Sequence, residues 1–158
     1  MPVSQPTAYA LLRTFGMLEF ELKRIPEFTG TGPYQSAKAN WRAVEDAVDR
    51  LPTPTFLDRV PASARTKLLG GTRNRPKVQV VATIQGRNLT HFRELPLHAS
   101  DARALIEAMR RVRNNLFHGG KEDPLEELYV GDDEEWALAA GEVATLLLDL
   151  IQRQQLRP

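Results

Sequence analysis

The sequence contains no cysteine among its 158 residues. This absence excludes a disulfide framework, a thiolate nucleophile and a zinc site built from cysteines. No apolar run approaches the ~18 residues that a membrane-spanning helix requires. The N-terminal residues Met1 to Pro6 show no basic patch followed by an apolar stretch, so no secretory signal is predicted. These absences predict a soluble cytoplasmic protein with no membrane association.

The overall composition is that of an ordinary globular protein. Hydrophobic residues make up 42% of the chain and charged residues 26%, proportions far from those of a disordered protein. A chain of this length fits one domain and can bury a substantial core. We therefore expect a single domain over residues 1–158.

The formal net charge of +1 hides an uneven distribution of charge along the chain. Residues 1–58 contain six Lys/Arg and seven Asp/Glu, residues 59–113 contain twelve and three, and residues 114–158 contain three and ten. The basic middle segment is suited to binding a polyanion such as RNA. The alternative is that the basic and acidic segments pack together and neutralise each other.

The spacing of apolar residues predicts a mostly helical fold. One such apolar stripe consists of Leu11, Phe15, Leu18 and Leu22. The predicted helices cover residues 7–25, 34–51, 63–69, 100–118 and 132–156. The last of these helices is apolar on more than one face, which indicates that it is buried centrally or lies in a subunit interface.

Between the third and fourth predicted helices, the pattern changes to that of a β-hairpin. Residues 77–84 are rich in β-branched side chains, residues 85–88 have the composition of a turn, and residues 89–95 form a second candidate strand. We therefore predict an all-α fold, a small helical bundle with one short β-hairpin insertion at 77–95. His91 and His98, in or near the hairpin, are interpreted as surface or packing residues.

The segment most able to carry chemistry is at the end of the predicted helix 100–118. At about 100° per residue, Arg111, Asn114 and His118 fall within roughly 60° of one another on the helix surface. One face therefore offers a guanidinium that matches phosphate oxygens and an imidazole that exchanges a proton near neutral pH. A purely structural role is the alternative, because a histidine near a helix C-terminus interacts favourably with the helix dipole.

The run Arg113-Asn114-Asn115-Leu116-Phe117-His118-Gly119 resembles the signature of the HEPN superfamily. That signature is an Arg, usually followed by a polar residue, then a His roughly four to six positions further on, near the end of a helix. Arg113 fits it with Asn114 as the polar residue, whereas Arg111 fits the longer spacing but precedes Val112. The order of the predicted helices, with the long one at the C-terminus, is similar as well.

This resemblance implies a metal-independent endoribonuclease that uses no cofactor and acts as a homodimer with its two motifs facing a shared cleft. Many such proteins are toxins or antiviral-defence effectors, so an antitoxin or another defence protein is an expected partner beside RNA. The implied catalytic residues are Arg113, Asn114 and His118, and no metal ligand is predicted. The supporting or RNA-binding residues are Arg111, Arg110, Asn115, Arg73 and Arg75.

In this interpretation the RNA 2′-hydroxyl attacks the adjacent phosphate, which leaves a 2′,3′-cyclic phosphate and a free 5′-hydroxyl. His118 takes or delivers a proton, and Arg113 stabilises the charge on the phosphorane oxygens. On a regular helix, however, Arg113 lies about 140° from His118, so Arg111 is a rival phosphate ligand. Either the chain turns before His118, or Arg113 reaches the His118 of a second subunit.

Two other functions are open from the sequence. One is a non-catalytic HEPN-like module that binds RNA or nucleotides, and the other is an interaction or scaffold protein in which the Arg–His cluster is structural. RNA cleavage in the presence of EDTA separates the enzyme from both, and salt-dependent RNA binding separates the two from each other.

Overall fold

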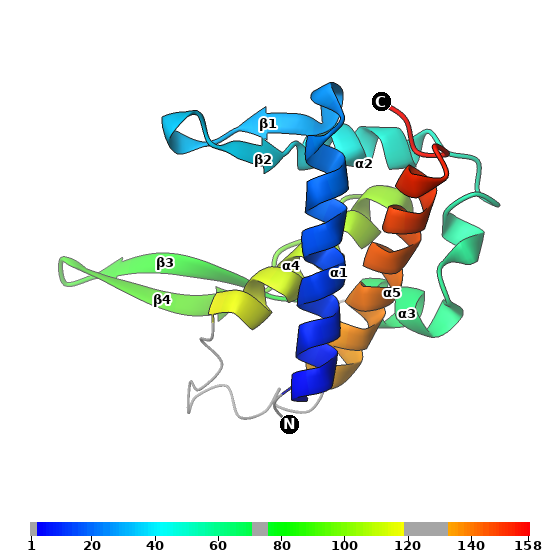
Figure 1. The fold of residues 1–158 in the computed structure, drawn as a ribbon. Helices are drawn as coiled ribbons and strands as arrows, with labels where there is room; N and C mark the ends of the chain where they lie inside the picture. The colour runs from blue at the N-terminus through cyan, green and yellow to red at the C-terminus, as the bar shows by residue number, and fades with distance from the viewer. Residues whose placement is uncertain (1–2, 71–75, 119–132) are drawn as a thin grey trace.

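The computed structural model describes residues 3–70, 76–118 and 133–158, except for the side chains at 117 and 118 (Figure 1). Within this part of the chain there are five α-helices, three of which, α1, α3 and α4, pack against α5. The helices are α1 (Gln5–Lys23), α2 (Trp41–Asp49), α3 (Ala62–Leu69), α4 (Asp101–His118) and α5 (Asp133–Gln152). None of these helices is both long and apolar enough to cross a membrane.

Helix α5 is the centre of the hydrophobic core. Its side chains are buried on several sides from Trp136 to Ile151, which agrees with the central position that its apolar pattern predicts. The predicted stripe of α1 is also buried, at Leu11, Phe15, Leu18 and Leu22. Burial of each such leucine or phenylalanine stabilises the fold by about 1.5–3 kcal/mol. Of the helix pairs in the described part of the chain, α1 and α5 pack against each other most extensively.

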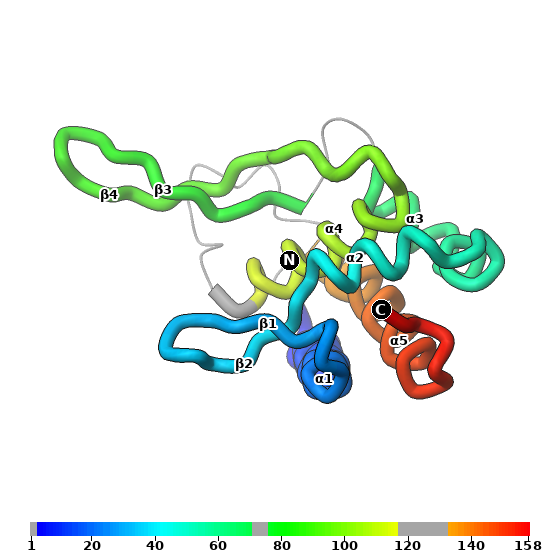
Figure 2. The backbone as a smooth tube through the Cα atoms, turned by 90° about the horizontal axis from the view of Figure 1, so that it is seen from above, coloured from blue at the N-terminus to red at the C-terminus, as the bar shows by residue number. Residues whose placement is uncertain are grey.

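The prediction of an all-α fold is wrong, because the described residues contain two antiparallel two-stranded sheets. Strand β1 (Thr29–Thr31) pairs with β2 (Ala37–Ala39), and β3 (Val78–Ile84) pairs with β4 (Arg87–Arg93). The fold is thus a mixed α/β arrangement, in which a helical bundle carries two hairpins. Both hairpins project from the same side of the bundle (Figure 1), and in the view of Figure 2 the C-terminal part of α4 lies between them.

The β1–β2 hairpin occupies a segment where the apolar spacing predicts a loop and the start of a helix at 34–51. Helix α2 begins only at Trp41, because Asn40 is its N-cap and accepts a hydrogen bond of 3.3 Å from the backbone of Ala43. Before the cap, the tip residues Tyr34 and Gln35 have φ angles of 56° and 59°, which a helix does not permit. Ladder pairing and capping therefore override the helical periodicity here.

The β3–β4 hairpin is largely exposed to solvent, with Val81 63% and Ile84 55% exposed. An isolated two-stranded hairpin is marginally stable, so its attachment to the bundle matters. Helix α4 holds the two ends of the hairpin through two side chains one turn apart. The Asn115 side-chain amide donates to the carbonyl of Lys77 at 2.7 Å. Arg111 donates to the carbonyls of Leu95 and Pro96 at 2.8 and 3.0 Å.

The N-terminal ends of α1 and α5 are joined by Glu134. Its carboxylate accepts a 2.7 Å hydrogen bond from the backbone N–H of Ser4 and another from the hydroxyl of Thr7. The hydrogen bond from Thr7, followed by that from Ser4, lowers the pKa of the Glu134 carboxyl. The first turn of α5 is acidic, as the helix dipole favours.

Candidate functional site

Part of the predicted site lies outside the described residues, namely Arg73, Arg75 and the side chain of His118. The backbone of α4 is helical through His118, so the chain does not turn before that residue. At ~100° per residue, Arg113 therefore lies about 140° from His118 around the helix axis. Of the two ways in which Arg113 could meet a His118, a turn of the chain is therefore excluded. Contact with the His118 of a second subunit is the one that remains.

Three of the predicted residues, Arg110, Arg113 and Asn114, line one groove of about 530 Å³. The groove is formed by α1, the β1–β2 hairpin, the start of α2 and the C-terminal half of α4. Its other lining residues are Phe15, Glu19, Gly30, Lys38, Ala39, Asn40, Trp41 and Arg42. We call this the basic groove, because it has four cationic side chains against a single carboxylate. Such an excess of positive charge at a concave surface favours an anionic ligand.

Arg113 is fixed in the basic groove by three contacts. Its guanidinium donates a hydrogen bond of 3.0 Å to the side-chain oxygen of Asn114 and lies 3.3 Å from a carboxylate oxygen of Glu19. The guanidinium carbon is 5.0 Å from the centre of the Phe15 ring. A guanidinium held over an aromatic face is pre-organised to meet the oxygens of a phosphate. The side chain is 29% exposed, so a ligand reaches it from solvent.

Arg110 makes a parallel set of contacts one helical turn earlier. Its guanidinium carbon lies 5.2 Å from the centre of the Trp41 ring and a nitrogen lies 3.7 Å from a carboxylate oxygen of Glu45. Burial lowers the pKa of Arg110, and Glu45 opposes this shift. Burial likewise raises the pKa of Glu45, and Arg110 opposes it. The ordinary pKa of arginine is so high that Arg110 stays charged at neutral pH.

The two arginines and the two aromatic rings form one continuous stack. The rings of Trp41 and Phe15 are in contact with each other, with their centres 5.4 Å apart and their planes tilted by 42°. Arg110 covers Trp41, and Arg113 covers Phe15. These contacts set the spacing of two of the four cations of the basic groove.

The other two cations of the groove, Lys38 and Arg42, were not identified from the sequence. Both are exposed, and they lie on β2 and at the start of α2. A signal for them is present in the run from Lys38 to Arg42, where two cations flank Trp41, the pattern of aromatic and basic residues that nucleic-acid-binding surfaces favour. The prediction of a helix over 34–51 obscured this signal, because it separated Lys38 from the motif at the end of α4.

Arg111 and Asn115, predicted as supporting residues, are both engaged with the ends of the β3–β4 hairpin rather than with the basic groove. Asn115 is 8% exposed, and its amide hydrogen bonds to Lys77. The side chain of Arg111 is 11% exposed and is also paired with Glu107 at 3.5 Å. The structure thus separates the two rival arginines, since Arg113 lies in the groove and Arg111 supports the hairpin.

The basic segment 59–113 is partly neutralised within the fold. Arg59 pairs with Asp149 at 2.8 Å and Lys67 pairs with Glu135 at 3.0 Å, both across to the acidic segment 114–158. By contrast, the exposed cations Arg87 and Arg93 lie on β4, on the projecting hairpin. Mutual neutralisation therefore accounts for some cations of this segment, whereas binding of a polyanion by the exposed ones stays a prediction.

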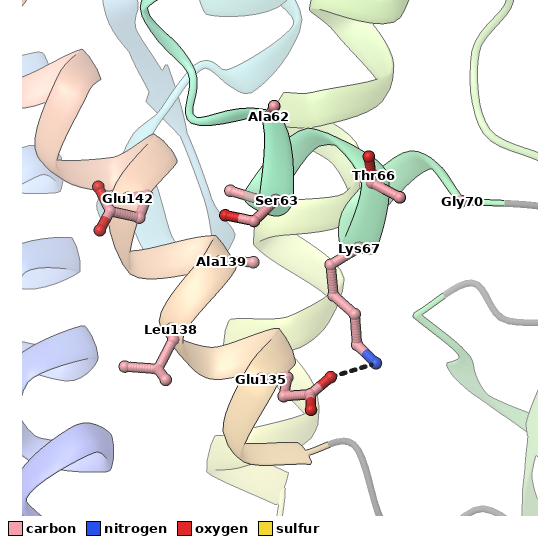
Figure 3. Close-up of a pocket in the computed structure, with 10 residues that line it drawn as sticks. Ala62, Ser63, Thr66, Lys67, Gly70, Glu135, Leu138, Ala139 and Glu142 are labelled. Atoms are coloured by element: carbon pink, nitrogen blue, oxygen red, sulfur yellow. Dashed lines mark ion pairs between the residues drawn. The ribbon is translucent and has the colours of Figure 1, made fainter.

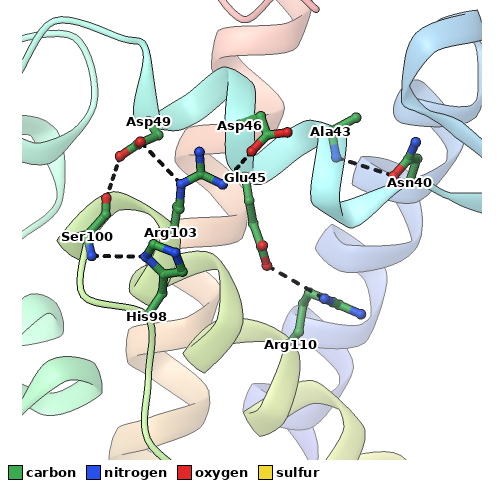
Figure 4. A network of polar contacts seen from close by, with 9 residues as sticks. All are labelled: Asn40, Ala43, Glu45, Asp46, Asp49, His98, Ser100, Arg103 and Arg110. Atoms are coloured by element: carbon green, nitrogen blue, oxygen red, sulfur yellow. Dashed lines mark hydrogen bonds and ion pairs between the residues drawn. The ribbon is translucent and has the colours of Figure 1, made fainter.

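A polar network connects the end of α2 with the start of α4 (Figure 4). Arg103 contacts Asp46 and, at 3.2 Å, Asp49, while the hydroxyl of Ser100 donates to Asp49. These hydrogen bonds, that of Ser100 first, lower the pKa of Asp49. His98 is exposed and its Nδ1 accepts from the backbone N–H of Ser100 at 3.0 Å. The network fixes α2 against α4, the two helices that hold Trp41 and Arg110 at the groove.

A second, wider cavity of about 770 Å³ lies between α3 and α5 (Figure 3). It is lined by small side chains of α3, by Leu138, and by the ion pair of Lys67 with Glu135. None of the residues predicted to carry function lies in it. We therefore assign the candidate functional site to the basic groove.

A comparison of the chain with family models, with curated proteins and with solved structures gives no match. Within the described ranges, no group of three or more metal-ligating side chains comes together. The basic groove and the motif at the end of α4 are therefore the features of the molecule that point to a function.

Proposed function

We propose that the protein is a metal-independent endoribonuclease of the HEPN type whose substrate strand lies in the basic groove. The observation that carries this proposal is the position of the motif residues Arg113 and Asn114 in a groove with three further cations. Phosphate oxygens suit forked guanidinium donors, and a groove with excess positive charge attracts the RNA backbone.

The chemistry follows from the 2′-hydroxyl of RNA. The oxygen of this hydroxyl forms a bond to the adjacent phosphorus, the bond from phosphorus to the 5′ oxygen breaks, and the products are a 2′,3′-cyclic phosphate and a 5′-hydroxyl. His118 accepts the proton of the attacking hydroxyl, and the same residue of a second subunit delivers a proton to the leaving oxygen. Arg113 stabilises the charge that develops on the phosphorane, and Asn114 orients the phosphate or His118.

The proposal includes a homodimer. Because Arg113 and His118 lie on different sides of one helix, a shared site is completed when the ends of two α4 helices face each other. A two-fold contact of this kind uses the same surface of each subunit. A toxin or antiviral-defence effector acting in the cytoplasm, with an antitoxin or another defence protein as partner, is the biological setting that we propose.

The second candidate is a non-catalytic module that binds RNA or nucleotides. The observation that favours it is the contact between Arg113 and Glu19, because a carboxylate at 3.3 Å competes with a phosphate for the same guanidinium. In this case the basic groove binds a strand without cleaving it. A scaffold protein is the third candidate, and it predicts no salt-dependent affinity for RNA.

The test is cleavage of a labelled single-stranded RNA by the purified protein in EDTA. Wild type should give products with cyclic phosphate ends, His118→Ala should give none, and Arg113→Ala should be slower by on the order of 10²-fold. Arg153→Ala, which changes an exposed residue at the end of α5, is the control and should cleave at the wild-type rate. Cleavage that persists in His118→Ala would contradict the proposal, and binding without cleavage by wild type would establish the second candidate.

A further inference from the structure

The tip of the β1–β2 hairpin presents an aromatic side chain to solvent. Tyr34 is 103% exposed, the highest value among the exposed large hydrophobic residues of the described chain. Its neighbours Gln35 and Ser36 are exposed as well. No other large apolar side chain of the β1–β2 hairpin is exposed, so the tip is not part of an apolar patch of the kind that a protein partner covers.

The backbone at the tip is in an unfavourable conformation for the residues that occupy it. Tyr34 and Gln35 have φ angles of 56° and 59°, in the left-handed region that glycine and asparagine prefer. At the tip of the other hairpin the corresponding residues are Gln85 and Gly86, with φ angles of 51° and 73°, so only the second of the two positions is a glycine there. Tyr34 is fully exposed in this conformation, so packing within the fold does not account for the tyrosine and its ring is accessible to a ligand.

The turn that carries the ring is well defined. The backbone N–H of Ser36 donates to the carbonyl of Pro33 at 3.1 Å, and that of Gly32 donates to the carbonyl of Ser36 at 2.7 Å. Pro33 restricts its own φ angle and reduces the number of conformations of the turn. The backbone that carries the ring is therefore ordered by two hydrogen bonds, so less conformational entropy of the turn is lost when the ring contacts a ligand.

The same hairpin leads directly from the tip into the basic groove. Its residues Gly30, Lys38 and Ala39 line the groove. Lys38 follows Tyr34 by four residues, two of the steps lie in the turn, and at ~3.3 Å per residue the distance along the chain is at most about 13 Å. A strand whose phosphates contact Lys38 thus passes Tyr34 within a few nucleotides.

We propose that Tyr34 stacks on a base of the single-stranded RNA whose backbone lies in the basic groove, and so fixes the position of the strand relative to the motif of α4. This inference rests on the proposed function. Stacking on an exposed aromatic ring is the usual way in which proteins hold unpaired bases, and it tolerates any base because each has a π-face. Tyr34 is a positioning residue and does not touch the reacting atoms.

The test is the affinity of the protein for a single-stranded 2′-O-methyl oligonucleotide, which lacks the nucleophilic hydroxyl and stays intact. Tyr34→Ala should weaken binding about tenfold, or about 1.4 kcal/mol, and Tyr34→Phe should bind like wild type. Tyr9→Ala, which removes an exposed tyrosine of α1, is the matched control and should have no effect.

Two glycine variants separate a role in binding from a role in folding. Gln35→Gly relieves the unfavourable φ angle but keeps the ring, so it should leave both the affinity and the midpoint of thermal unfolding undiminished. Tyr34→Gly relieves the angle and removes the ring, so it should weaken binding about tenfold without lowering the thermal midpoint. A loss of affinity in Gln35→Gly equal to that in Tyr34→Gly would overturn the proposal, because the turn rather than the ring would then matter.

An abasic position moved along the oligonucleotide identifies the base involved. At one position the missing base should weaken binding to wild type about tenfold and have no effect on binding to Tyr34→Ala. If wild type binds the strand but Tyr34→Ala binds it equally well, the stacking proposal is wrong and the proposed function stands. If wild type does not bind the strand at any salt concentration, both are wrong.

Discussion

The side-chain amide of Asn115 lies 2.7 Å from the carbonyl oxygen of Lys77, the residue before strand β3. A residue of the run from Arg113 to Gly119 is thus a structural anchor for a hairpin that projects from the bundle. One turn earlier, Arg111 holds the residues that follow β4 in the same way. The hairpin and the motif helix therefore take their positions from each other.

Replacement of Asn115 by Ala should loosen the β3–β4 hairpin. The carbonyl of Lys77 loses its partner in a partly buried position, so the free energy of unfolding should fall by about 1–2 kcal/mol. Relative to wild type, hydrogen exchange of the backbone amides should become faster in β3 and β4 and change less in α5. The neighbouring exposed residue supplies the control, because Asn114→Ala should change stability by less than about 0.5 kcal/mol. Equal loss of stability in the two variants would contradict the anchoring role.

Lys38 and Arg42 should contribute to RNA affinity through charge alone. Each contact with a phosphate of a single strand contributes about −0.7 to the slope of log affinity against log salt concentration. Lys38→Ala and Arg42→Ala should therefore each make the slope less steep by about this amount, as measured by fluorescence anisotropy. Arg153→Ala should leave the slope unchanged. A wild-type slope near zero would mean that the groove binds no phosphates.

Glu19 should weaken the binding of RNA, because its carboxylate forms an ion pair with the guanidinium of Arg113 at 3.3 Å and competes with a phosphate for it. Glu19→Gln keeps the size of the side chain and removes the competing charge. We expect RNA affinity to rise by about two- to fivefold, the range that corresponds to a partly exposed ion pair. Glu21→Gln is the matched control, since Glu21 is also on α1 but pairs with Arg24 at 3.4 Å. An affinity that falls in Glu19→Gln would show that Glu19 orients Arg113 for binding instead.

Stability should fall in acid through Glu134. Hydrogen bonds from Thr7 and Ser4 hold the pKa of its carboxyl below the ordinary value, so the ionised form stabilises the folded state. This contribution is fully present above the ordinary pKa of about 4.3 and is lost as the pH falls through the lower pKa of the folded state. The free energy of unfolding, measured with denaturant, should therefore fall less between pH 7 and pH 3 in Glu134→Gln than in wild type. An identical difference in the two proteins would contradict this role.

The sequence alone predicts the helical part of the fold well, because periodicity reports burial directly. The stripe of Leu11 and Leu22 on α1 and the apolar faces of α5 correspond to the core. The first hairpin is missed, because strands as short as Thr29–Thr31 have no measurable alternation and the residues after the tip continue a helical pattern. Pairing between strands depends on contacts that local periodicity does not contain.

The candidate site is predicted in part for a related reason. A helical projection groups Arg111 with Asn114, but it contains no information about which neighbouring element receives each side chain. The structure separates these two residues, since the hairpin ends bind Arg111 and the groove exposes Asn114. The helical periodicity predicts that Trp41 and Phe15 are core residues. Their contact with two arginines depends on the packing of three helices, which the sequence does not show.

The side chains of the six residues from Arg110 to Asn115 contact three different parts of the molecule. Arg110, Arg113 and Asn114 point to the groove, Arg111 and Asn115 hold the hairpin, and Val112, 6% exposed, enters the core. A single inserted or deleted residue would rotate everything after it by about 100° and exchange these assignments. An insertion or deletion in this stretch should therefore disturb the groove, the hairpin contacts and the core together, whereas a point substitution affects only one of the three.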